Sequence, residues 1–126
     1  MSRHTQRTLA ALKKQGYTVG MVERFIPIPG GHGKRHDLFG FIDIIAIKEG
    51  EILGVQSCGS GFSEHDKKIL SEPKAVEWLK AGGKLELWAW RKIKQKRGGS
   101  RYIYQPRIKQ YTLEDFDALL LLPNNT

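Results

Sequence analysis

Hydrophobic and polar positions along the chain change their spacing several times, and each change predicts a new element. Apolar residues at helical spacing predict a helix from Thr5 to Gln15, with Thr5 as its candidate cap and Gly16 just past its end. The segment from Tyr17 to Phe25 alternates loosely and is rich in strand-forming residues, which predicts a strand. The prolines and glycines of residues 27–34 then predict a loop.

Two apolar runs in the middle of the chain are typical of buried strands. Leu38 to Ile47 is almost continuously apolar, as expected of a central strand that is covered on both faces. A turn at residues 48–51 leads into a second strand, from Ile52 to about Cys58. We therefore expect these two strands to form a hairpin.

The second half of the chain predicts a helix, two more strands and a short final helix. Residues 64–80 have helical periodicity, and residues 84–90 and 101–111 read as strands around a Gly-Gly-Ser turn. The last helix runs from Thr112, a candidate capping residue, to about Leu122. This order indicates an α/β layer fold with a mixed sheet, formed by residues 1–126 as a single domain. The inward positions expected on the 64–80 helix are Ile69, Leu70, Val76 and Leu79.

Composition narrows the setting in which the protein works. The chain has 126 residues and a formal net charge of +8. The chain shows no apolar run long enough to span a membrane and no secretory signal pattern. Its single cysteine, Cys58, cannot form an internal disulfide, which fits a reducing compartment. We expect a cytoplasmic protein with no membrane partner.

The positive charge is concentrated in one segment. Residues 91–109 contain eight Lys or Arg and no acidic residue, which predicts a basic hairpin. Contact with a nucleic-acid backbone explains such a segment, and a solvated surface is the alternative. The candidate nucleic-acid contacts are Lys34 and Arg35 in the loop before Asp37, with Arg91, Lys94, Lys96, Arg97 and Arg101 in the basic segment.

An aspartate within the apolar run is the first sign of chemistry. Asp43 stands in the sequence Ile-Asp-Ile-Ile-Ala-Ile, where an unpaired charge is costly. If the hairpin pivots symmetrically about Glu49 and Gly50, Asp43 faces Gln56, and Cys58 shares a face with Gln56. Asp43 is then either a carboxylate that accepts local hydrogen bonds or a ligand for a divalent cation, with Gln56 adding an oxygen.

These residues resemble a known family of nucleases. Asp43-Ile-Ile-Ala-Ile, the turn at Gly50, and Gly54-Val55-Gln56-Ser57-Cys58 resemble the core motif of the PD-(D/E)XK nucleases. The likeness is nearest to archaeal-type Holliday junction resolvases and small phage-borne relatives, and it covers roughly residues 5–92. It implies a restriction-endonuclease-like core of a helix, three strands, a helix and a strand. In this chain a basic C-terminal hairpin and a short helix would follow that core.

The motif departs from the family pattern at three positions. Ile42 replaces the proline, Gln56 stands where Asp or Glu is usual, and Cys58 stands where Lys is usual. Glu23 and Asp37 are the candidates for the missing negative charge. Lys68, or its neighbour Lys67, is the candidate for the missing ammonium.

The resemblance implies a function and a set of partners. Asp43, Gln56, Glu23 and Asp37 would hold Mg²⁺ or Mn²⁺, and with Lys68 they would form the catalytic group. The activity implied is cleavage of phosphodiester bonds in duplex or branched DNA by a homodimer. One alternative is a catalytically degenerate nucleic-acid-binding protein that keeps the nuclease fold. Another is a basic RNA-associated or assembly module that needs no metal.

Overall fold

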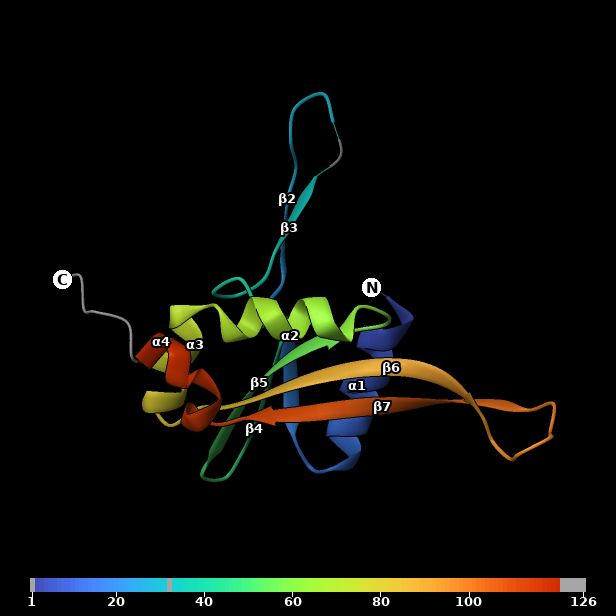
Figure 1. Ribbon diagram of the computed structural model, residues 1–126. Helices are drawn as coiled ribbons and strands as arrows, with labels where there is room; N and C mark the ends of the chain where they lie inside the picture. The colour runs from blue at the N-terminus through green and yellow to red at the C-terminus, as the bar shows by residue number, and fades with distance from the viewer. Residues whose placement is uncertain (1, 32, 121–126) are drawn as a thin grey trace.

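A computed structural model describes residues 2–31 and 33–120 as a mixed α/β structure (Figure 1). A twisted sheet forms its centre, helices lie on both sides of the sheet, and two hairpins project from the body. The elements in chain order are α1 (Arg3–Lys14), β1 (Thr18–Met21), β2 (Arg24–Ile26), β3 (Lys34–His36), β4 (Ile44–Lys48), β5 (Glu51–Cys58), α2 (Phe62–Leu70), α3 (Pro73–Lys80), β6 (Lys84–Lys94), β7 (Tyr102–Tyr111), a 3₁₀ turn η1 (Leu113–Phe116) and α4 (Asp117–Leu120).

The main sheet is mixed and has five strands in the order β1-β4-β5-β6-β7. The strands β1, β4 and β5 form an antiparallel meander. The chain then crosses over through α2 and α3, so that β6 lies parallel to β5, and β7 returns antiparallel to β6. The predicted α/β fold with a mixed sheet is therefore confirmed.

Alternation along the strands separates two apolar layers. Leu85, Leu87 and Ala89 of β6 pack with Ile69 of α2 and with residues of α3 on one face. Trp88 of β6 and Leu53 and Val55 of β5 pack with Leu12 of α1 on the other face. Both faces of the central strands are covered, which explains their nearly continuous apolar sequence.

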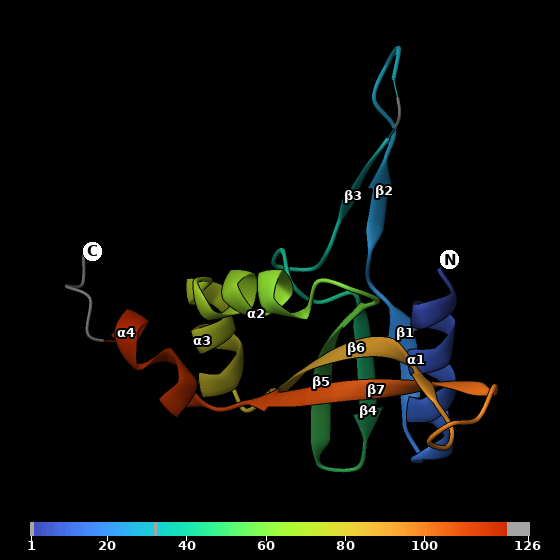
Figure 2. The same cartoon turned by 45° about the vertical axis from the view of Figure 1, so that its right-hand side comes forward.

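The strand predicted from Tyr17 to Phe25 is divided between two sheets. Residues 18–21 form β1 at the edge of the main sheet, whereas residues 24–26 pair with residues 34–36 in a separate two-stranded sheet. In Figures 1 and 2 this second sheet, which we call the arm (residues 24–36), stands away from the body. The loop predicted over residues 27–34 therefore corresponds mostly to the connection between β2 and β3.

The strand predicted from Leu38 to Ile47 begins later than expected. Leu38 and Ile42 bridge across a tight turn, in which Phe39 has φ 57° and Gly40 has φ 85°. Only Ile44–Lys48 forms β4. Phe41 and Ile42 are buried in the turn itself, so the apolar run reflects burial and not an extended strand.

The predicted helices are present, but the first begins earlier than predicted and the second is divided in two. The first helix begins at Arg3, and Ser2, not Thr5, is its N-cap. The helix predicted over residues 64–80 is two helices, because Pro73 starts α3 at a position where a missing N–H costs nothing. A capping box of Thr112 and Asp115 starts the C-terminal turn as predicted, while residues 121 and 122 of that helix lie outside the described residues. None of the described helices is long and apolar enough to cross a membrane.

Candidate metal centre

Three carboxylates meet where the arm joins the main sheet. Glu23 directly precedes β2, Asp37 directly follows β3, and Asp43 directly precedes β4. One oxygen from each carboxylate lies within 4.8 Å of the other two. They line a small polar cavity of about 210 Å³, and Arg35 of β3, the start of α1 with its N-cap residue, and β5 form the rest of its wall. The predicted convergence of these three residues is therefore observed.

Gln56 joins the carboxylates through the predicted hairpin register. Ile44 pairs with Val55 and Lys48 with Glu51, so the strands pivot about the turn as expected. The Gln56 Nε2 donates to Asp37 Oδ2 and to Asp43 Oδ2, both at 3.2 Å. Gln56 is only 4% exposed, and its Oε1 has no hydrogen-bond partner within residues 2–31 and 33–120.

Asp43 is the buried member of the cluster. Its two oxygens accept from the Ser57 backbone N–H at 3.2 Å, and its exposure is 4%. Burial and the charges of Asp37 and Glu23 together raise the pKa of Asp43 to about 7, although the Ser57 hydrogen bond opposes the rise. Among the described residues, no lysine or arginine forms an ion pair with the Asp43 carboxylate.

Two basic side chains lie at the rim of the cluster. Arg35 Nε is 3.4 Å from Glu23 Oε1, and Lys68 Nζ is 4.0 Å from Asp37 Oδ2. Both are largely solvent-exposed, so their ion pairs are weak. The predicted lysine therefore lies beside the carboxylates, and Arg35 contacts one of them.

Cys58 does not line the candidate site. The hairpin places it on the same face as Gln56, as predicted, but it packs in the apolar layer with Ile69 and Leu87. Burial raises the pKa of the Cys58 thiol, and the charge of Asp43 adds to this effect. Asp43, Gln56 and Cys58 thus share one end of the hairpin, but Cys58 does not line the polar cavity, because apolar side chains of α2 cover it.

The start of α1 supplies residues that the sequence did not indicate. Ser2, His4 and Thr5 line the cavity with Ser57. The Ser57 hydroxyl donates to the His4 carbonyl and shares a hydrogen bond with Thr8, which fixes α1 against β5. Burial lowers the pKa of His4, and Arg7 lowers it further. Serine is a common N-cap residue, so the polar residues before the first apolar stripe are the sequence signal that could have indicated this part of the cavity.

The donor set fits a hard divalent cation. Carboxylates and an amide oxygen are ligands that Mg²⁺ and Mn²⁺ accept. A half-turn of the Gln56 amide would bring Oε1 to the carboxylates and would break no hydrogen bond to that oxygen, since it has none. The same turn would remove the hydrogen bonds that Gln56 now donates to Asp37 and Asp43 and that partly compensate their charges. A bound cation would compensate those charges in their place.

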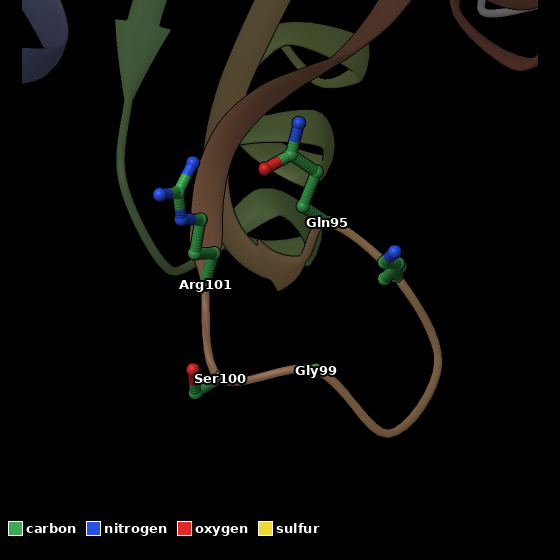
Figure 3. A pocket seen from close by; sticks show the side chains of 5 residues that line it. Gln95, Gly99, Ser100 and Arg101 are labelled. Carbon is green, nitrogen blue, oxygen red and sulfur yellow. The ribbon is translucent and has the colours of Figure 1, made fainter.

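The remaining candidate nucleic-acid contacts are exposed on the two projecting hairpins. Lys34 and Arg35 lie on β3 of the arm, and Arg91 and Lys94 lie on β6. Lys96 and Arg101 line an open hollow of about 600 Å³ at the β6–β7 turn, which also carries Arg97 (Figure 3). Gln95 and Arg101 face each other across the base of this turn, where the Gln95 N–H donates to the Arg101 carbonyl at 2.9 Å. The predicted basic hairpin is thus a long extension of the sheet.

Comparison with known proteins adds no assignment to this geometry. No protein-family model matches the chain, and neither a curated protein nor a solved structure matches it.

Proposed function

We propose that the protein is a Mg²⁺- or Mn²⁺-dependent DNA endonuclease with a restriction-endonuclease-like core. The observation that carries the proposal is the cluster of Glu23, Asp37 and Asp43 around the unpartnered Gln56 Oε1. The element order also supports it: a helix, an antiparallel meander, a helical crossover and a parallel strand. This is the order that the sequence resemblance implies for such a core.

Each residue of the cluster has a definable role in this proposal. Asp43, Glu23 and Asp37 would hold the cation with the amide oxygen of Gln56. A cation held there would supply activation of a water molecule and neutralisation of charge on the phosphate. Lys68, 4.0 Å from Asp37, supplies the ammonium that is absent at Cys58 and stabilises charge that develops on the phosphate. The Ser57 N–H fixes the orientation of the Asp43 carboxylate.

The projecting hairpins define the substrate in this proposal. The arm and the β6–β7 hairpin both carry exposed basic residues, and they leave the body in different directions in both views (Figure 2). Contacts of this kind hold the phosphate backbone without reading sequence. Two diverging basic hairpins suit duplex or branched DNA. Resolution of a four-way junction requires two cuts, so the proposal includes a homodimer for that substrate.

The chemistry of Gln56 and Cys58 favours one second candidate. Gln56 brings no charge to the cation, and Cys58 is buried with a raised thiol pKa. A protein that keeps the nuclease fold and binds nucleic acid without cutting it would have such a site. This candidate differs from the first in metal binding and in cleavage, whereas both predict salt-sensitive binding of DNA.

Cleavage of labelled four-way junction, duplex and single-stranded DNA tests the proposal. We expect the wild type to cut in Mg²⁺ or Mn²⁺, and Asp43→Asn to lose activity by at least about 100-fold. Glu49→Gln is the matched control, since Glu49 is an exposed carboxylate in the β4–β5 turn at the far end of the hairpin. Absence of cutting and of Mn²⁺ binding by a wild type that still binds DNA would establish the second candidate.

A further inference from the structure

The arm exposes apolar side chains that contribute nothing to the core. Every residue of β2 and β3 is exposed. Phe25 is 64% exposed and Ile28 is 47% exposed. A two-stranded ribbon of this size has little stability of its own in water, so an arm of this composition suits a partner that covers its apolar residues.

The charge of the arm indicates the chemistry of that partner. Residues 24–36 contain Arg24, Lys34 and Arg35 and no Asp or Glu. The basic residues lie on the strands, while Ile28 stands beyond β2 between Pro27 and Pro29. A basic stem with an apolar, proline-containing end is complementary to a polyanion that has an apolar interior, and stacked DNA is such a partner.

The position of Phe25 is built into the arm. The Phe25 ring lies over Gly33, which directly precedes β3, at the place where any other residue would put its Cβ. A side chain at position 33 would therefore displace the ring. Phe25 is nonetheless left largely exposed to solvent.

We propose that the arm is a DNA wedge, which inserts Phe25 and Ile28 into the minor groove and unstacks neighbouring base pairs. The inference rests on the proposed function for its DNA substrate and extends it to how that substrate is deformed. Apolar wedges of Phe, Ile and Pro unstack bases in this way in minor-groove-binding proteins. Arg24 and Lys34 contact the phosphates beside the insertion.

The arm also fixes where the deformation occurs. Glu23 and Asp37 flank the arm, so the arm begins and ends at the carboxylate cluster. Ile28 lies five positions beyond Glu23 in the chain, a reach of at most about 17 Å at about 3.3 Å per residue. At about 3.4 Å per base step, the unstacked bases lie within about five steps of the phosphate at the cluster.

Duplexes with 2-aminopurine at successive positions test the wedge in EDTA, where no cleavage occurs. We expect the wild type to raise 2-aminopurine fluorescence by about twofold or more at one or two adjacent positions, as unstacking does. Phe25→Ala combined with Ile28→Ala removes the rise, while DNA affinity changes only a few-fold because the phosphate contacts remain. The control variant, Ile47→Ala with Ile52→Ala, removes an exposed cross-strand pair on the main sheet and keeps the rise.

The outcomes separate the wedge from the nuclease. No fluorescence rise with bound wild type, or an equal rise with the arm variant, overturns the wedge even where cleavage in Mn²⁺ is observed. A rise that depends on Phe25 and Ile28 supports the wedge even where the protein does not cut. If the wild type sediments as a dimer, the arm variant as a monomer, and fluorescence does not change, the arm binds a second copy and the wedge is wrong.

Discussion

Asp43 and Asp66 are both partly or wholly withdrawn from water, yet their surroundings shift their pKa values in opposite directions. Asp66 on α2 accepts from Lys109 Nζ at 2.8 Å and from the Tyr111 hydroxyl at 2.6 Å. Burial raises the pKa of Asp66, but these hydrogen bonds outweigh it and lower the pKa overall. Burial raises the pKa of Asp43 to about 7, and the charges of the two facing carboxylates contribute to that rise. Within the described part of the chain, Asp66 has a lysine partner, whereas Asp43 has no ion pair with a basic side chain.

This contrast separates a structural carboxylate from a candidate ligand. Asp66 connects α2 to β7, so its partners belong to the same packed body. Among the residues that the structure describes, the Asp43 side chain has only N–H donors, from Ser57 and Gln56, although Arg35 and Lys68 lie near the other two carboxylates. A perturbed carboxylate in a polar cavity is a functional-site candidate for that physical reason.

The largest expected effect is on stability in the absence of metal. Asp43→Asn should stabilise the protein at pH 8 in EDTA, by up to about 4 kcal/mol, because the asparagine carries no buried charge. The folded-state pKa of Asp43 lies above its unfolded value, so the wild type loses stability as the pH rises from about 4 to about 7. Urea denaturation of both proteins across this pH range measures the difference.

The stability difference between the wild type and this variant narrows when metal is present. Mn²⁺ at 100 times its Kd should stabilise the wild type by about 2.7 kcal/mol and should leave Asp43→Asn nearly unchanged. Glu49→Gln, which removes an exposed carboxylate, should follow the wild type in both conditions. If the wild type and Asp43→Asn were equally stable at every pH, the charge of Asp43 would be compensated within the protein as fully as the charge of Asp66.

The next effect concerns the ammonium beside the cluster. Lys68→Ala should lower cleavage by about 10- to 100-fold, because it removes a positive charge that would face the developing charge on the phosphate. Lys67→Ala is the matched control, since Lys67 is the neighbouring exposed lysine on the same helix. Cleavage rates are compared at saturating DNA, with affinity measured separately in EDTA. Equal rates in the two variants would limit Lys68 to its ion pair with Asp37.

The part of the site that the sequence predicts is the part set by strand alternation. Two strands joined by a short turn have a fixed register, so Asp43 is placed opposite Gln56 by counting from Gly50. The nearly continuous apolar run from Leu38 to Ile47 also predicted that both faces of the sheet are covered there. The element order followed from changes in periodicity, which are strong for segments of this length.

The rest of the candidate site depends on local turns, which the hydrophobic pattern does not predict. Asp37 reaches Asp43 because Phe39 adopts a positive φ, which is unusual for an aromatic residue, and the chain turns sharply there. Glu23 reaches Asp43 because the N–H of the preceding Val22 donates to the Asp43 carbonyl at 3.1 Å. The three-residue strands of the arm are too short to produce an alternation signal. Cys58 follows the strand pattern correctly, but only the packing of α2 shows that it is covered. The split at Pro73 was a missed signal, since proline favours the first position of a helix.

The smallest expected effect concerns Asp66, whose carboxylate has its partners within the protein. Asp66→Asn should destabilise the protein by about 1–2 kcal/mol at pH 7, because hydrogen bonds to a charged acceptor are stronger than those to an amide. The folded-state pKa of Asp66 is lowered, so its contribution is present above the unfolded pKa of about 4 and is lost as the pH falls below it. Urea denaturation of Asp66→Asn and the wild type at pH 7 and pH 3 measures this change.

A double-mutant cycle with Lys109→Gln assigns the loss to the ion pair. We expect the two substitutions to be non-additive at pH 7, because each one removes the same contact between Lys109 and Asp66. A fully additive pair would mean that Tyr111 alone holds the carboxylate. A gain in stability for Asp66→Asn, as expected for Asp43→Asn, would break the comparison, since both carboxylates would then be charges that the fold leaves uncompensated.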